Sequence, residues 1–244
     1  MPEQLWFTAI LNHALAGPVT GLLRSLGLEP RHPQAPITNT VAMEVLVFVF
    51  LVTMFFLTRL RLSVEHPGGL QHTFEGIHNF IRAQSEEIIG HGSEKYAPYL
   101  VILGLFILFC NLLGLIPGFE SPTALPIVPL GCAVATFIYY HYQGLRRQGL
   151  WHYLKHFAGP MPALAFLMVP IEIVSHLARV LSLTVRLFAN MFAGDMVTMI
   201  FISLVPVGVP IIFMGLHIGV SLIQTYVFVL LAMVYLGGAV AEQH

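Results

Sequence analysis

The sequence predicts an all-α polytopic membrane protein with about five membrane helices and one interfacial amphipathic helix. Charged residues make up only 9% of the 244 residues, whereas a soluble domain carries about a quarter. Hydrophobic residues make up 57%, and the mean hydropathy is +0.80. Such a chain has too little charge to cover a water-soluble surface and too much apolar residue to stay solvated as a disordered chain. Both of those classes are therefore excluded.

The cysteines and the charge balance exclude further classes of protein. Cys110 and Cys132 both lie in apolar runs, which rules out a disulfide framework or a cysteine-based zinc cluster. The formal net charge is -1 and there is no basic run, so nucleic-acid binding is not expected. No Gly-x4-Gly-Lys-Ser/Thr loop occurs. We therefore expect no catalytic site, no metal and no cofactor in this chain.

Apolar runs locate the membrane helices. A spanning helix needs about 20 apolar residues to cross a hydrocarbon core of about 30 Å. Five stretches reach or exceed this need, and they lie at 41–58, 98–116, 123–142, 162–204 and 206–240. The first contains a single acid, Glu44. We expect one membrane domain over 38–244, after an N-terminal segment over 1–37 that lacks the features of a signal peptide.

The segment at 70–89 is predicted to be a helix of a different kind. Its apolar residues fall close to helical spacing, at Leu70, Phe74, Ile77, Ile81 and Ile88. Its charged residues occupy the other faces, at Glu75, Arg82, Glu86 and Glu87. This pattern is typical of a helix that lies on the membrane surface. A polar soluble loop is the alternative.

Basic residues in short loops predict the orientation, because cytoplasmic loops carry an excess of Lys and Arg. They end the first apolar run and follow the third, at Arg59, Arg61, Arg146, Arg147 and Lys155. The N-terminus and the turn at 117–122 are then periplasmic, and the C-terminus is cytoplasmic. Arg24 and Arg31 lie outside against this rule.

The last third of the chain is predicted to be a helical hairpin. At 1.5 Å per residue, the stretches at 162–204 and 206–240 would each be about 50 Å long or longer, which exceeds the bilayer. Pro206 and Pro210 mark a turn between them. We therefore expect two antiparallel helices, both steeply tilted.

Polar and ionisable residues lie inside this hairpin, where charges are costly and mark an ion path or a paired site. They are Glu172, His176, Arg179, Ser182, Arg186, Asn190, Asp195, His217 and Gln224. An internal ladder of Glu172 with His176 and Arg179 would explain part of the set. It does not explain Arg186, which has no acid at i±3 or i±4.

The position of the turn predicts which residues share a depth in the two helices. Residues whose numbers sum to about 411 lie at one level, so Arg186 meets Gln224 and Asp195 meets His217. On a straight helix Arg186 and Asp195 face opposite ways, whereas His217 and Gln224 share a face. Direct contact in both pairs would need a bend or a twist, so the contacts stay open at this point.

The segment at 182–195, Ser-Leu-Thr-Val-Arg-Leu-Phe-Ala-Asn-Met-Phe-Ala-Gly-Asp, resembles the signature of the a subunit of F-type ATP synthases, the membrane stator of the Fo motor. The resemblance covers most of the chain from about residue 38. It includes Asn111-Leu-Leu-Gly-Leu-Ile-Pro117, Gln71-x3-Glu75, His217-x6-Gln224 and Val234-Tyr-Leu236. An autonomous secondary ion transporter is the alternative, but its usual internal repeats are not found. A purely structural anchor would leave the buried charges without a reason.

The resemblance implies roles for individual residues. Arg186 corresponds to the arginine that faces a carboxylate on each subunit of a rotating c-ring. Asp195 and His217 match the polar pair of the periplasm-side half-channel, and Asn190 and Gln224 lie near the arginine. Glu172 matches an acid of the cytoplasmic half-channel.

The resemblance also implies partners and a location. The partners are the c-ring, the b subunits of the peripheral stalk, the remainder of Fo and F1 indirectly, and membrane lipid. The location is the bacterial plasma membrane. Two departures stand out: Leu125 and Ile127 replace an Asp and an Asn of many relatives, which leaves no basis for a polar contribution there, and Asp195 is one methylene shorter than the usual Glu.

Overall fold

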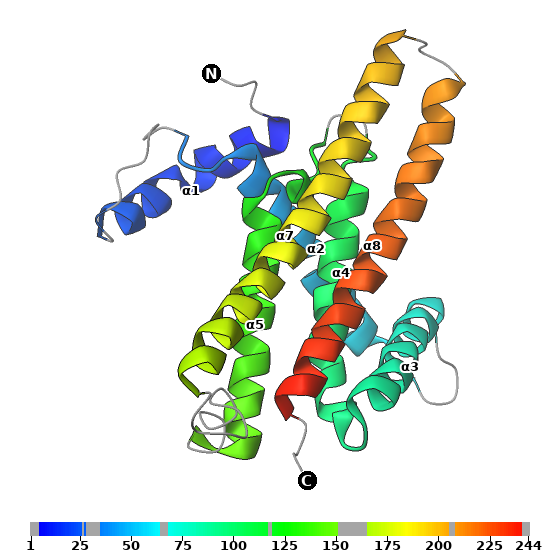
Figure 1. Ribbon diagram of the computed structural model, residues 1–244. Coiled ribbons are helices and arrows are strands. Elements are labelled where there is room, and N and C mark those ends of the chain that lie inside the picture. The colour runs from blue at the N-terminus through cyan, green and yellow to red at the C-terminus, as the bar shows by residue number, and fades with distance from the viewer. Residues whose placement is uncertain are drawn as a thin grey trace.

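The computed structural model describes residues 5–25, 27, 35–63, 68–116, 119–150, 165–204 and 208–240. Within these ranges all regular structure is helical. The elements are α1 (Trp6–Ser25), α2 (Asn39–Leu60), α3 (Gly69–Ile89), the 3₁₀ helix η1 (Ser93–Tyr96), α4 (Ala97–Leu113), the 3₁₀ helix η2 (Pro122–Ala124), α5 (Ile127–Gln148), α7 (Ala165–Leu204) and α8 (Val209–Val240). The long helices form one bundle, with α1 and α3 lying across its opposite ends (Figure 1). The predicted all-α class is confirmed.

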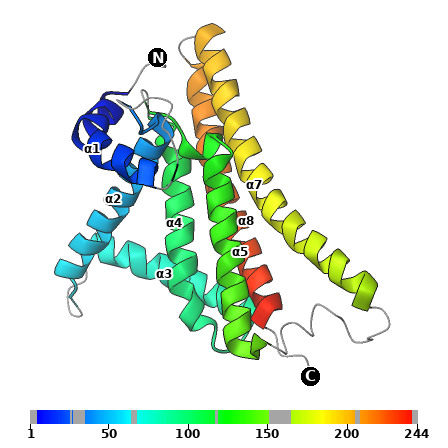
Figure 2. The same ribbon diagram turned by 90° about the vertical axis from the view of Figure 1, so that its left-hand side faces the viewer.

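Four helical segments in the described ranges are long and apolar enough to cross a membrane. They are Asn39–Leu60, Ser93–Leu113, Phe166–Leu204 and Ile211–Val240. The remaining predicted membrane helix, α5, corresponds to the span at 123–142; it has 22 residues and stands in the bundle beside α4 and α8 (Figure 2). It is not among the four, because its second half carries polar residues such as His141, Arg146 and Arg147. The chain is a multi-pass membrane protein.

The helix α5 begins four residues after residue 123, where the third span was predicted to begin. Residues 122–124 form η2, and α5 begins at Ile127 after Pro126. Proline has a fixed φ and no N–H, which suits the start of a helix better than its interior. The apolar run therefore includes a turn that hydropathy does not reveal.

The helix predicted at 70–89 is α3, which runs across the end of the bundle where α8 ends (Figures 1 and 2). Its first turn is tied to the end of α2 through the side chain of Gln71. The N–H of Ser63 donates to Oε1 of Gln71 at 3.1 Å, and Nε2 of Gln71 donates to the carbonyl of Ser63 at 3.0 Å. Further along, the hydroxyl of Tyr226 on α8 donates to Gln84 on α3.

The C-terminal hairpin consists of α7 with 40 residues and α8 with 32, about 60 and about 48 Å long by their rise per residue. The two helices run antiparallel, and α7 crosses the bundle obliquely (Figures 1 and 2). The turn predicted at Pro206 lies outside the described residues, as does Lys155.

The buried core and the exposed apolar surface lie on different helices. The largest buried side chains include Leu100 and Ile107 of α4 and Phe228 and Met233 of α8. By contrast, only 11% of the apolar stretch of α7 is buried inside the structure. This helix therefore presents an apolar flank to its surroundings, which water would not tolerate over such an area.

Candidate functional site

Arg186 lies near the middle of α7 and is half-buried. Its Nη2 is 3.5 Å from Oγ of Ser182, one turn earlier on the same helix. Among the described residues no carboxylate forms an ion pair with it. A permanent guanidinium charge is therefore held at this level of the bundle without a counter-charge from the described part of its own chain.

One turn beyond Arg186, the two hairpin helices are joined by a pair of amides. Nδ2 of Asn190 donates to Oε1 of Gln224 at 2.6 Å. Nε2 of Gln224 is buried and has no hydrogen-bond partner in the described ranges. The antiparallel register predicted Gln224 at the level of Arg186, but the hydrogen bond of Gln224 is with Asn190. Around the axis of α7, Asp195 lies about 180° from Arg186 but about 140° from Asn190. Pairing through Asn190 therefore needs less bending or twisting of the helices than pairing through Arg186.

The second pair across the hairpin is Asp195 with His217, as the depth argument predicted. Oδ1 of Asp195 lies 3.8 Å from Nδ1 of His217. The imidazole is only 4% exposed, and its Nε2 is buried without a hydrogen-bond partner in the described ranges. A buried ring with an unpaired nitrogen beside a half-buried carboxylate is suited to accepting and passing protons.

A cavity of about 660 Å³ opens beside this pair, between η2 with its flanking loop, α7 and α8. Asp195 and His217 both line it, and so does Glu120 of the loop before η2. Leu125 lines it as well. The wall of the cavity is mostly apolar. Among the described lining residues, only Glu120, Asp195 and His217 can carry a charge or bind a proton.

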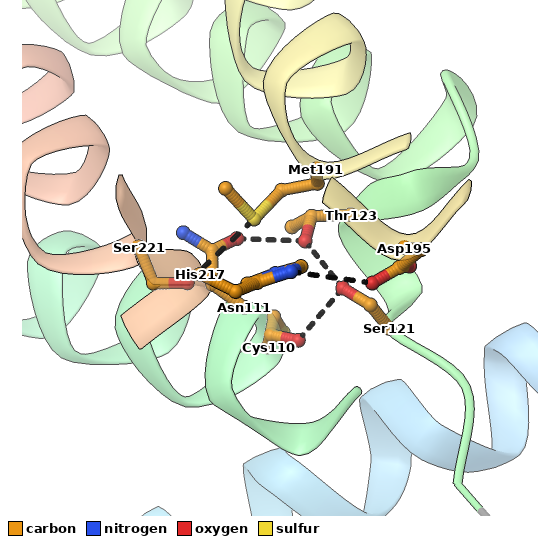
Figure 3. A network of polar contacts seen from close by, with 8 residues as sticks. All are labelled: Cys110, Asn111, Ser121, Thr123, Met191, Asp195, His217 and Ser221. Carbon is orange, nitrogen blue, oxygen red and sulfur yellow. Dashed lines mark hydrogen bonds and ion pairs between the residues drawn. The ribbon is translucent and has the colours of Figure 1, made fainter. Parts of the chain in front are cut away.

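A chain of hydrogen bonds continues from the cavity toward Asn111 on α4 (Figure 3). The hydroxyl of Thr123 donates to Oδ1 of Asn111 at 2.7 Å, and Nδ2 of Asn111 donates to the hydroxyl of Thr225 on α8 at 3.4 Å. Ser121 donates to the carbonyl of Cys110 and lies 2.9 Å from the Thr123 hydroxyl. The segment that contains Leu125 and Ile127 thus contributes the hydroxyls of Ser121 and Thr123.

Sequence reasoning did not select Asn111, Thr123 or Glu120 as site residues. Asn111 and Thr225 are 114 positions apart, so no local pattern joins them. The one available signal was that Asn111 opens one of the motifs that carry the resemblance.

A second polar group lies nearer the beginning of α7. Nε2 of His176 is 3.3 Å from Oε1 of Glu172, and its Nδ1 is 2.8 Å from the hydroxyl of Tyr140 on α5. The ladder considered from the sequence is therefore formed between Glu172 and His176. Arg179 instead lies over the ring of Tyr235 on α8, with 5.2 Å from its Cζ to the ring centroid.

Known proteins match this chain over nearly its whole length. The family described as ATP synthase A chain matches residues 40–237. The chain belongs to this family. The ATP synthase subunit a of Koribacter versatilis is 60% identical over 100% of both chains. That of Solibacter usitatus is 51% identical over 96% of this chain and 100% of its own. The ATP synthase subunit a 1 of Syntrophotalea carbinolica is 46% identical over 82% of this chain and 84% of its own.

The ATP synthase A chain family is a non-catalytic membrane subunit of the F-type ATP synthase, part of its Fo complex. The resemblance drawn from the segment at 182–195 is thereby confirmed. In the structure this signature segment holds Arg186, Asn190 and Asp195 in order along one helix, and the last two contact Gln224 and His217 of α8. Among the described residues no three His, Cys, Asp or Glu side chains gather as a metal ion would require.

Proposed function

We propose that this Fo subunit guides protons along two half-channels to and from the carboxylates of a rotating c-ring. The observation that carries the proposal is Arg186, a permanent charge without a carboxylate partner in the described part of its own chain. Polar groups extend from it in both directions along the hairpin. Asn190, Asp195 and His217 lie toward one end, and Glu172 lies toward the other.

Arg186 acts as a fixed charge rather than as a carrier. A guanidinium keeps its proton under biological conditions, so it cannot relay protons. It favours the ionised form of a carboxylate that approaches it. As each protonated ring carboxyl arrives, Arg186 promotes loss of its proton and holds the carboxylate briefly. Protons then cannot pass directly from one half-channel to the other.

The periplasm-side half-channel consists, in this proposal, of the cavity near the hairpin turn and the groups that line it. Asp195 and His217 can each bind and release a proton. Asn190 and Gln224, joined at 2.6 Å, continue the polar path toward Arg186. The cavity of about 660 Å³ is large enough for several waters.

The cytoplasmic half-channel includes Glu172 on the opposite side of Arg186. Its carboxylate is about one-third exposed and is paired with His176. His176, Arg179 and Ser182 lie between Glu172 and Arg186 in sequence, on the same helix. They provide polar atoms along the route that a proton leaving the ring would follow.

The partners proposed are the c-ring, which covers the exposed apolar flank of α7, and the b subunits of the peripheral stalk. The membrane is the bacterial plasma membrane, with the N-terminus periplasmic and the C-terminus cytoplasmic. Supporting this orientation, Arg59 in the last turn of α2 and Arg146 in the last turn of α5 lie toward the end of the bundle where α8 ends (Figure 2).

The test is Arg186→Ala in membrane vesicles that contain the assembled synthase. We expect loss of both ATP synthesis and ATP-driven proton pumping, because the arriving ring carboxyl then lacks the guanidinium that favours loss of its proton. Arg82→Ala is the control, since Arg82 is an exposed arginine of α3 that pairs with Glu94. Copurification of the ring checks assembly. An assembled Arg186→Ala complex that makes ATP at a near wild-type rate would overturn the proposal.

A further inference from the structure

The contact between α5 and α7 holds an imidazole between two oxygen-bearing side chains. His176 is 8% exposed, and Tyr140 is 2% exposed. The Tyr140 hydroxyl lies 2.8 Å from Nδ1 of the imidazole, and Oε1 of Glu172 lies 3.3 Å from its Nε2. One ring thus joins a buried phenol on α5 to a partly exposed carboxylate on α7.

We propose that His176, oriented by Tyr140, carries protons together with Glu172 in the cytoplasmic half-channel. The inference rests on the proposed function, because it assigns two further roles within one of the two half-channels. His176 is the group that binds the proton. Tyr140 is a positioning residue that acts through the imidazole.

The proton transfer follows from the two contacts of the ring. In the tautomer whose Nδ1–H donates to the Tyr140 oxygen, the lone pair of Nε2 faces Glu172. A proton on the Glu172 carboxyl can then move to Nε2, which leaves a carboxylate beside an imidazolium. Release of that proton from Nε2 to water restores the neutral ring. The Tyr140 oxygen accepts Nδ1–H throughout, so Tyr140 neither gains nor loses a proton.

Charged and titratable neighbours from each packed helix act on this ring. On α7, Glu172 supplies a counter-charge for the imidazolium, whereas Arg179 repels it. On α5, the ring of His141 has its centroid 4.7 Å from that of His176. On α8, Tyr235 lies under the Arg179 guanidinium. Two imidazolium ions this close would repel each other, so a charge on one ring opposes a charge on the other.

A purely structural role for His176 makes a different prediction from a proton-carrying one. A ring that only packs α5 against α7 would affect the amount of assembled complex, or lower the rate by one factor at every pH. A ring that binds protons changes the pH dependence of the rate. In water an imidazole titrates at about 6.5 and a glutamate carboxyl at about 4.3. The imidazole therefore collects protons in a range where the carboxyl no longer does.

The test is ATP-driven proton pumping by the whole synthase in inverted vesicles, from about pH 6 to about pH 9 in the outer medium, a range that begins near the imidazole titration. In such vesicles the cytoplasmic face is outside, so the outer medium supplies protons to the half-channel that contains Glu172. Tyr140→Phe and His176→Gln are expected to lose pumping first at the alkaline end. The alkaline limb of the profile should move to lower pH, by at most the roughly two units that separate the two groups in water.

Tyr139→Phe is the matched control, because it removes the hydroxyl of the neighbouring residue on α5, whose ring stacks on Tyr99 instead. Its profile should match wild type. Profiles of Tyr140→Phe and His176→Gln that superimpose on wild type, or that fall by one factor at every pH, overturn the inference. Arg186→Ala in the same vesicles separates the two proposals. If it is inactive while Tyr140→Phe is unchanged, the proposed function stands and only the role of His176 fails.

Discussion

The imidazole of His217 on α8 lies directly against the backbone of Gly194 on α7. A Cβ at position 194 would lie 2.7 Å from Nδ1 and 2.8 Å from Cε1 of the ring. The next residue, Asp195, is 3.8 Å from the same Nδ1. The small residue lets the two helices approach closely enough for the carboxylate and the imidazole to meet.

Gly194→Ala should therefore displace His217 from Asp195 without removing either group. We expect proton flux through Fo to fall roughly tenfold or more, since misplacing reacting groups by about 1 Å can cost on the order of a hundredfold. The measurement is passive proton conduction by membranes stripped of F1. Gly215→Ala is the control, because a Cβ there has no atom within 4 Å. Equal flux in the two variants would contradict the role of this contact.

Removing the groups themselves is a separate prediction. Asp195→Ala and His217→Ala should each slow passive proton conduction, by about tenfold or more for loss of a positioned proton-transfer group. Both side chains line a cavity rather than the apolar core, so the complex should still assemble. Conduction is compared with wild type after the copurified ring has been quantified. Unchanged conduction in both variants would remove the pair from the proton path.

The helices could be predicted from sequence because the hydrocarbon core imposes a length and an apolar composition on each span. Predicted and observed bounds differ by two residues at each end of α2, which is Asn39–Leu60 against the predicted 41–58. They differ most at α5, where Pro126 and the η2 turn interrupt an apolar run. Hydropathy depends on composition alone, so it does not reveal a turn inside an apolar segment.

The site was predictable only where its residues lie on one helix or where the antiparallel register relates two helices. The antiparallel register predicted a common depth for Asp195 and His217, and the structure brings the two groups within 3.8 Å. The same register assigned Gln224 to the level of Arg186, whereas the hydrogen-bond partner of Gln224 is Asn190, one turn further along α7. The bond between Asn111 and Thr225 joins distant helices, and only the folded chain reveals it.

The orientation predicts which side of the membrane reaches each end of the bundle. Arg147→Cys, at the exposed end of α5, should react with a membrane-impermeant thiol reagent only from the cytoplasmic side. Glu120→Cys, in the exposed loop before η2, should react only from the periplasmic side. The native Cys110 and Cys132 are both buried, so they give a low background. Labelling of Arg147→Cys only from the periplasm would reverse the assignment.

The final prediction concerns the chemistry that Arg186 requires. If a positive charge alone sufficed, Arg186→Lys would be mild. A lysine, however, loses its proton readily when desolvated, whereas a guanidinium does not. Arg186 is half-buried beside an apolar flank, with only the Ser182 hydroxyl as a described hydrogen-bond partner, so a lysine there would gain little to hold its charge. We expect ATP synthesis by an assembled Arg186→Lys complex to fall below about a tenth of wild type, since permanence of charge is lost. Synthesis near the wild-type rate would show that the site needs only a cation.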